Sequence, residues 1–332
     1  MKITKYFIIL FLLLSSTSFS ADDHSFNEWL KSFKIHALKN GISESTFDMA
    51  MSNVNFLPKV IKYDRFQPEF YEDTKTYISK RSSNQKVKQG SKLYMANKDF
   101  INSIDNDFAV EKSLLLALMG IETNFGTYVG KMDILSSLAT LSFDERRSEF
   151  FTRELVTILQ LVESNKIDHS ILYGSWAGAF GNFQFMPSTI KQYAIDYDQN
   201  NIIELKSTKD SFASAANYIS SIGWKKNQPC FIKVKLNDNV PKKLLNTSAK
   251  KLHNKQEFRF LKKYIKEKDI NIFDDNLIGS IITPDKDIIP NSENLEPAYI
   301  VFENYEKILQ WNRSLRFGLA VCTLKNKFEN VL

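Results

Sequence analysis

The stretch from residue 110 to 126 constrains the fold of this chain more than any other. Its apolar side chains recur with the period of an α-helix. They are Leu114, Leu118, Ile121 and Phe125. A helix this apolar is stable only when other elements bury it, so the rest of the chain has to pack around it. Its last turn carries one carboxylate, Glu122, within the sequence GIETNFG.

Glu122 is the first candidate for chemistry. Leu118 and Met119 precede it by one helical turn, which places its carboxyl on or beside an apolar face. Desolvation favours the protonated form of a carboxyl, and a general acid needs that form. From position alone, a glutamate that points to solvent at a helix end is the simpler interpretation.

Residues 173–188 form a second unusual stretch, rich in glycine and aromatic residues. Glycine permits close backbone approach, and Ser175, Asn182 and Gln184 add hydrogen-bonding groups. The aromatic residues are Trp176, Phe180, Phe183 and Phe185. Flat rings beside amide groups suit a sugar. The alternative is a buried turn without a ligand.

The remaining pattern is mainly helical, with a change of character after Trp224. Strands are expected at 230–236 and 298–302, where apolar residues partly alternate. Helices are expected at 25–54 with a break at Gly41, and then at 70–78, 86–104, about 142–165, 188–194, 211–222 and 305–324. The helix near 142 would begin with a capping box at Ser142–Glu145. The fold class is therefore mainly α with a small mixed insert.

Residues 1–20 have the features of a secretory signal peptide. Lys2 and Lys5 precede the apolar run 6–14, and Ser18 and Ser20 suit cleavage before Ala21. No cysteine lies near that point, so a lipoprotein anchor is not expected. No later run of about 18 apolar residues predicts a membrane span, so no stable membrane insertion is expected after cleavage.

Net charge and cysteine content say little about the binding partner or the compartment of this protein. The formal net charge is +6, which fits a polyanionic or wall-like partner, although a solvated lysine-rich surface is the simpler explanation. Cys230 and Cys322 are the only cysteines. They can pair in an oxidising compartment, and the sequence leaves that pairing open.

Three segments in order carry a resemblance to a known family. They are GIETNFG around Glu122, TLSFDERRSEFF at 140–151 and GSWAGAFGNFQFMPSTIKQYAIDY at 174–197. Together they resemble the lytic murein transglycosylase B family. DRFQPEF at 64–70, Asn217-Tyr218 with Gly223-Trp224, and WNRS at 311–314 extend the match over most of the chain. Phe183 departs from the pattern, because that position is usually glycine.

The resemblance implies a periplasmic enzyme with a lysozyme-like helical domain, at 21–228 and 298–332, and a small mixed α/β subdomain at 229–297. It implies cleavage of the MurNAc–GlcNAc β-1,4 bond of peptidoglycan without hydrolysis, which leaves a 1,6-anhydro-muramyl end. Glycosidases usually need two carboxylates, yet neither Asp133 nor Asp144 stands in a recognisable catalytic setting. If the sugar supplies its acetamido group and its 6-hydroxyl, Glu122 suffices as acid and then base.

The resemblance also assigns residues to the substrate cleft. Those that match the family are Ser175, Gln184, Tyr218 and Asn312. Arg146 and Arg147 match an arginine pair that can meet the muramyl lactyl or peptide carboxylates, or they lie on a solvated helix turn. Trp311 and Phe317 stand where the family usually has tyrosines. They can stack on a sugar but lack a hydroxyl.

Residues 196–202 resemble part of an EF-hand loop, and some members of the family bind calcium there. Calcium takes oxygens from alternate positions and a late carboxylate. The candidate ligands are Asp196, Asp198, Asn200, the carbonyl of Ile202 and Asp210. Asn201 replaces the usual glycine and Ser207 occupies position twelve, so a polar turn without metal stays the alternative. No cofactor is expected to be required.

Other classes of site find no support in the sequence. The four histidines form no zinc spacing, no Gly-Lys-Ser/Thr phosphate loop occurs, and no basic and aromatic pattern predicts nucleic-acid binding. The histidines are His24, His36, His169 and His253. The expected partner is the peptidoglycan glycan strand, with cell-wall synthesis or division proteins as further candidates. A hydrolytic muramidase and a non-catalytic peptidoglycan-binding scaffold remain alternatives.

Overall fold

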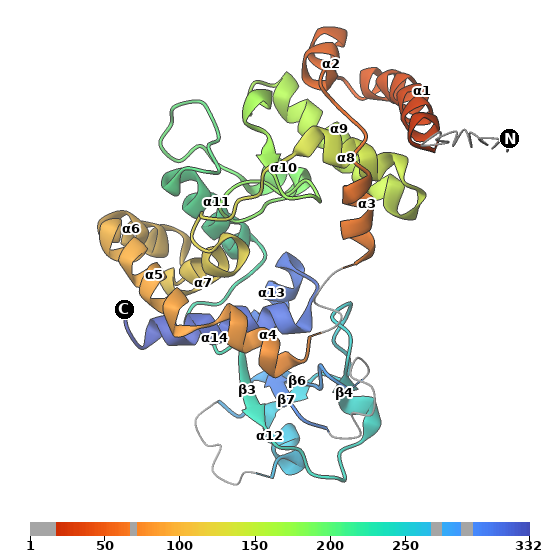
Figure 1. The fold of residues 1–332 in the computed structure, drawn as a ribbon. Helices are drawn as coiled ribbons and strands as arrows, with labels where there is room; N and C mark the ends of the chain where they lie inside the picture. Colours follow the sequence, from red (N-terminus) through yellow and green to blue (C-terminus); the bar gives the residue numbers. More distant parts are fainter. Residues whose placement is uncertain (1–17, 67–71, 267–273, 287–294) are drawn as a thin grey trace, which may run out of the picture.

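The computed structural model describes residues 18–66, 72–266, 274–286 and 295–332 (Figure 1). The expected signal peptide lies almost entirely outside these ranges, as does the end of the DRFQPEF segment. None of the helices in the described ranges has the length and hydropathy that a membrane crossing requires.

Helices dominate, as the sequence predicts. In chain order they are α1 (Ser18–Lys39), α2 (Glu44–Met51), α3 (Pro58–Arg65), α4 (Thr74–Arg81), α5 (Asn84–Ala96), α6 (Lys98–Phe108), α7 (Lys112–Thr123), α8 (Ile134–Phe143), α9 (Ser148–Glu163), α10 (Pro187–Tyr193), α11 (Thr208–Ser221), α12 (Phe258–Leu261), α13 (Glu303–Trp311) and α14 (Leu315–Glu329). Two short strands, β1 (Met132–Asp133) and β2 (Tyr173–Gly174), pair beside them.

The apolar helix of the sequence is α7, and residues 113–120 are all buried. Helices α5, α6, α11 and α14 pack around it. Full burial of each leucine side chain contributes roughly 1.5–3 kcal/mol. The expected central helix is therefore confirmed, and it is the element that the others surround.

A small sheet lies at the opposite end of the molecule from α1 and α2, with α4 and α14 between (Figure 1). Its order is β3 (Phe231–Val234), β7 (Ala298–Val301), β6 (Ile278–Ile282) and β4 (Leu245–Asn246), and β5 (Gln256–Glu257) also pairs with β6. Strands β3, β7 and β6 are antiparallel, whereas β4 runs parallel to β6.

Strand β7 explains how the sheet joins two hydrophobic cores. Successive side chains of a strand point to opposite faces. Tyr299 and Val301 pack into the large helical core. Ala298 and Ile300 pack into a smaller core, together with residues such as Val234 and Phe258. Strand β7 is therefore buried on both faces. The domain boundaries at 228/229 and 297/298 stay a prediction.

A disulfide joins Cys230, just before β3, to Cys322 in α14, with 6.1 Å between their Cα atoms. The pairing that the sequence left open is thus formed in this structure. The cysteines are 92 positions apart, and in the chain-entropy model a loop of that length stabilises the fold by about 4–5 kcal/mol. The bond ties the sheet to the helix that covers α7.

Two sequence expectations about helix boundaries are wrong. Ser142 lies inside α8, where its hydroxyl donates to the carbonyl of Leu138 at 2.7 Å. It therefore does not cap α9, which begins only at Ser148. The single helix expected at 86–104 is two helices, α5 and α6. They meet at Asn97, which leaves helical geometry with φ −132° and ψ 28°.

Candidate active site

Glu122 lies in the last turn of α7, just before an unusual backbone turn. Asn124, Phe125 and Gly126 have φ values of 49°, 60° and 81°, and a left-handed φ is uncommon for residues other than glycine. The Phe125 ring packs over Gly120, where an added Cβ would lie 2.7 Å from the ring. This packing holds the turn and explains why Gly120 has no side chain.

Thr123 joins this turn to the loop rich in glycine and aromatic residues. Its hydroxyl donates to the carbonyl of Asn182 at 2.7 Å and accepts from the amide of Gly126 at 3.0 Å. The side chain of Asn182 in turn donates to Ser211 of α11 at 3.1 Å. Thr123 is buried. Sequence reasoning missed it, although a polar residue next to Glu122 in so apolar a helix was the available signal.

The loop itself is a tight, mostly buried turn. Phe180 and Phe185 exchange backbone hydrogen bonds of 2.9 Å, and Gln184 between them has a left-handed φ of 52°. Phe180, Phe183 and Phe185 are all buried. The three phenylalanines therefore build the core behind the loop, and they do not offer the exposed flat faces that the sequence suggested.

An aromatic stack of Trp311, Tyr218 and Tyr193 adjoins Glu122. The Trp311 and Tyr218 rings lie 5.0 Å apart and the two tyrosine rings 4.4 Å apart, both nearly parallel. The indole N–H of Trp311 donates to Oε1 of Glu122 at 2.9 Å. This contact joins α13 to the end of α7 and brings together two residues that the sequence selected separately.

Trp311 departs from the family pattern, which usually has tyrosine at this position, but it still makes a polar contact. The sequence predicted that tryptophan at this position loses a hydroxyl contact, and the indole N–H supplies a different polar contact. Phe183, another departure from the pattern, meets the Trp311 ring edge-on at 6.3 Å. The two unusual residues therefore pack against each other.

Tyr218 is held in place at the middle of the stack. Its hydroxyl donates to the carbonyl of Gln310 at 3.2 Å. Burial, reinforced by the neighbouring Tyr193, raises the pKa of Tyr218 to about 12. The phenol therefore stays neutral over the whole physiological range and acts there as a donor, not as a base.

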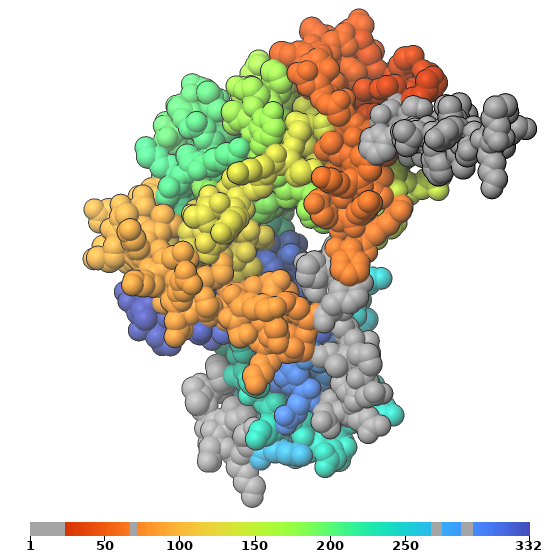
Figure 2. Space-filling view, in the orientation of Figure 1, coloured from red at the N-terminus to blue at the C-terminus, as the bar shows by residue number. Residues whose placement is uncertain are grey.

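Glu122 borders a cavity of about 410 Å³ between α7 and the segment 80–89. Lys86 also borders it. The ammonium group of Lys86 donates to the carbonyl of Gly120 and to Oδ1 of Asn124, which satisfies polar groups at the C-terminal end of α7. Burial lowers the pKa of Lys86, and Arg81 lowers it further. The face shown in Figure 2 is also hollowed between α7 and α3, although no residue of α3 lines this cavity.

Ser175 and Gln184, both expected in the cleft, hold the loop in shape. The Ser175 hydroxyl accepts from the amides of Ala177 and Ala179 at 3.3 and 2.9 Å. The Gln184 amide donates to the carbonyls of Val129 and Gly181 at 3.2 and 2.9 Å. A direct contact of either side chain with a sugar stays a prediction.

Arg146 and Arg147 both bind Asp64 of α3. Nε of Arg146 donates to Oδ2 of Asp64 at 2.7 Å, and Arg147 pairs with the other carboxylate oxygen. Asp64 is only 3% exposed, so this pair neutralises a buried charge. The guanidinium groups that the resemblance assigned to substrate carboxylates thus already have a protein carboxylate.

The other residues expected in the site are buried, cap a helix or pair with another side chain. Phe317 of α14 is 3% exposed, which leaves it no surface on which a sugar can stack. Asn312 ends α13, where its backbone N–H donates to the carbonyl of Ile308. Asp133 caps α8 and Asp144 pairs with Arg65 at 2.7 Å. Neither aspartate therefore has the setting of a second catalytic carboxylate.

The calcium candidate is an acidic cluster. Carboxylate oxygens of Asp196, Asp198 and Asp210 lie within 4.8 Å of one another. Asp210 is buried and accepts from the amides of Tyr197 and Glu204. Asn201 adopts a left-handed φ of 71°, the conformation that the missing EF-hand glycine normally provides. The substitution at that position therefore keeps the shape of the loop.

Comparison with known proteins identifies the family. Residues 25–326 match the family described as the transglycosylase SLT domain. The chain belongs to this family. It is 39% identical over 141 residues to the membrane-bound lytic murein transglycosylase B of Escherichia coli K12, a match that covers 42% of this chain and 39% of that protein.

Solved structures confirm the mainly helical, lysozyme-like fold. The chain superposes with a TM-score of 0.81 and 29% identity on SltB3 from Pseudomonas aeruginosa in complex with NAG-anhNAM-pentapeptide, covering 92% of this chain and 79% of that one. It also superposes on the Escherichia coli lytic transglycosylase Slt35 in complex with calcium, with a TM-score of 0.73, 24% identity, and coverage of 93% and 94%.

We predict that Thr123→Val lowers the free energy of unfolding by about 2 kcal/mol, because it leaves the buried carbonyl of Asn182 and the amide of Gly126 without a partner. Urea unfolding of the purified protein measures the change. Thr157→Val is the matched control, since its hydroxyl bonds only within its own helix, and a change within about 0.5 kcal/mol is expected. Equal stabilities for the two variants would contradict the role of Thr123.

Proposed function

We propose that this protein is a peptidoglycan lytic transglycosylase with Glu122 as its single acid and base. The observation that carries the proposal is the position of Glu122, which borders a cavity and receives the indole N–H of Trp311. Family membership supports the reaction class. The relative matched over 141 residues is a lytic murein transglycosylase, and SltB3 was solved with a NAG-anhNAM-pentapeptide.

In the proposed first step, Glu122 protonates the glycosidic oxygen O4, which links MurNAc C1 to GlcNAc C4. The C1–O4 bond breaks, and the MurNAc acetamido oxygen stabilises the developing positive charge at C1. GlcNAc leaves with its 4-hydroxyl restored, and Glu122 is now a carboxylate. No second protein carboxylate is needed, which agrees with the structural partners of Asp133 and Asp144.

In the second step, the Glu122 carboxylate takes the proton from the MurNAc 6-hydroxyl. O6 attacks C1, the acetamido oxygen is released, and a 1,6-anhydro ring closes. Glu122 ends protonated and ready for another cycle, and no water is consumed. Trp311 positions the carboxyl through both steps, because its N–H holds Oε1 in one orientation.

We place the reaction in the periplasm, where peptidoglycan lies. The buried disulfide Cys230–Cys322 suits an oxidising compartment, and the signal peptide at 1–20 stays a prediction. The glycan strand is the proposed partner.

We predict that Glu122→Gln lowers turnover by at least about 10³-fold, since the isosteric amide cannot transfer the proton. Purified sacculi are digested and the soluble products are analysed by mass spectrometry. Glu28→Gln, which removes an exposed carboxylate paired with Lys31, is the control and keeps wild-type activity. Reducing ends in place of anhydro ends would establish a hydrolytic muramidase. Binding without any wild-type turnover would establish a scaffold.

A second prediction concerns Trp311. Trp311→Phe keeps an aromatic ring against Tyr218 and removes the N–H that reaches Glu122. A hydrogen bond to a charged group contributes about 1.5–3 kcal/mol, so we expect kcat to fall by roughly 10- to 100-fold with little change in KM. Trp29→Phe, on α1, is the matched control. Wild-type kcat in the Trp311 variant would show that the contact does not position the acid.

We further propose that the loop 196–210 holds one calcium ion. Three carboxylates converge there, and calcium takes six to eight oxygen ligands. The Asn200 side chain and the Ile202 carbonyl are the other candidate ligands. A bound ion there would hold the loop against the start of α11, which carries Asp210.

We predict that calcium raises the melting temperature of the purified protein and that EDTA reverses the effect. At one hundred times Kd, a ligand stabilises the folded state by about 2.7 kcal/mol. Asp198→Asn should abolish the response, and this exposed carboxylate makes only a 3.7 Å ion pair with Lys209. Magnesium serves as the control ion. The proposal fails if calcium has no effect on the wild type or stabilises the variant equally.

A further inference from the structure

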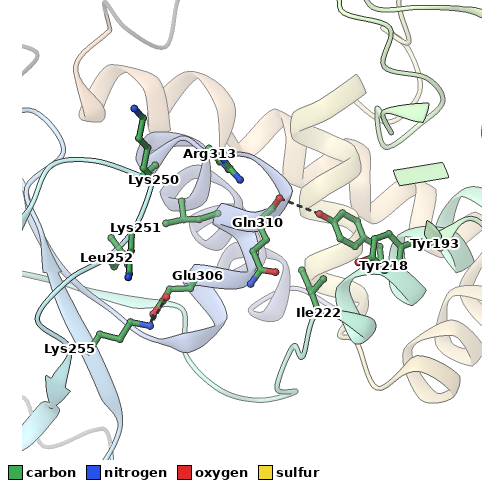
Figure 3. Close-up of a pocket in the computed structure, with 12 residues that line it drawn as sticks. Tyr193, Tyr218, Ile222, Lys250, Lys251, Leu252, Lys255, Glu306, Gln310 and Arg313 are labelled. Atoms are coloured by element: carbon green, nitrogen blue, oxygen red, sulfur yellow. Dashed lines mark hydrogen bonds and ion pairs between the residues drawn. The ribbon is translucent and has the colours of Figure 1, made fainter. Parts of the chain in front are cut away.

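A second cavity, of about 460 Å³, lies beside the aromatic stack (Figure 3). Tyr218 and Tyr193 form one border, and α13 and the segment 249–255 of the β4–β5 connection form the others. Because Trp311 contacts both Tyr218 and Glu122, one continuous wall connects the proposed acid to this cavity.

The cavity is strongly basic. Lys250, Lys251, Lys255 and Arg313 line it, with Glu306 as the one acidic residue of the lining. Lys255 pairs with Glu306 at 2.6 Å. No ion pair joins Lys250, Lys251 or Arg313 to any carboxylate in the part of the chain that the structure describes, and all three residues are exposed. Their charges are therefore available to a ligand.

The lysines stand on an ordered loop. Leu252 between them is buried and belongs to the large helical core. Asn246 closes the loop, because its side chain accepts from the amide of His253 at 2.7 Å and donates to the carbonyl of the same residue at 3.2 Å. Arg313 follows Trp311 by two residues. The positive charges thus lie on two segments, the loop 249–255 and the end of α13. Both segments border the aromatic stack.

We infer that this cavity binds the free carboxylates of the peptide attached to muramic acid, a proposal that rests on the proposed function. Glycan sugars are neutral where the lactyl group is amide-linked, so the stem peptide brings the negative charge. Arg146 and Arg147, which the resemblance assigns to this role, both pair with Asp64. The lysine loop and Arg313 provide cations next to the wall that would hold the sugar.

The test compares two substrates: glycan strands that carry stem peptides, and strands from which an amidase has removed the peptides. The stripped strands keep only the lactyl carboxylate next to the sugar ring, so the comparison isolates the carboxylates of the peptide. Lys250→Gln combined with Lys251→Gln should raise KM on peptide-bearing strands about tenfold, since each exposed charge pair contributes modestly, while kcat is unchanged. On stripped strands the variant should match the wild type. The difference should shrink at high salt, because salt screens exposed charges.

Lys242→Gln combined with Lys243→Gln is the matched control, since it removes two exposed lysines outside the cavity lining. An unchanged KM on peptide-bearing strands, or an equal rise on both substrates, would overturn the proposal. Calorimetry measures the binding of a soluble disaccharide-pentapeptide to the Glu122→Gln protein, with and without the lysine substitutions. This experiment separates the proposed peptide binding from the proposed catalytic function. It measures peptide capture even if the wild type proves inactive and the proposed function fails.

Discussion

The burial of α7 is the constraint on which the rest of the structure depends. Its last turn cannot continue as a helix, because Asn124, Phe125 and Gly126 take left-handed φ values. Packing of the Phe125 ring over Gly120, and the hydrogen bonds of Thr123 to Asn182 and Gly126, hold this turn in place. Glu122 is therefore presented from a rigid element, which the catalytic role proposed for it requires.

The wall opposite Glu122 shows how a family site tolerates departures from its usual residues. Phe183 stands where glycine is usual and Trp311 where tyrosine is usual, and their rings meet at 6.3 Å. The phenylalanine ring at 183, where glycine has no side chain, buttresses the larger ring at 311. The indole N–H then meets the carboxylate at 2.9 Å. Changes that look independent along the chain are a single packing arrangement in space.

Charge is divided between two places with different tasks. The Arg146 and Arg147 pair neutralises Asp64, which is almost fully buried and needs compensation for its lost hydration. The lysine loop and Arg313 are exposed beside the aromatic stack. The arginine pair therefore stabilises the fold, because it compensates a buried carboxylate. The lysine loop and Arg313 pair with no buried carboxylate among the described residues, so their charges are open to a ligand.

The sequence by itself determined the mainly helical class, the buried helix with Glu122 at its end, and the stop of α11 near Gly223. Each of these is marked in the sequence by a helical repeat of apolar residues or by a helix-breaking residue. Tertiary structure alone decided that the Cys230–Cys322 disulfide forms, that Phe317 is buried and that the arginine pair binds Asp64. It also brought Trp311 to Glu122. The residues of that last contact are 189 positions apart, and no local pattern records which distant side chain will fill a given space once the helices have packed.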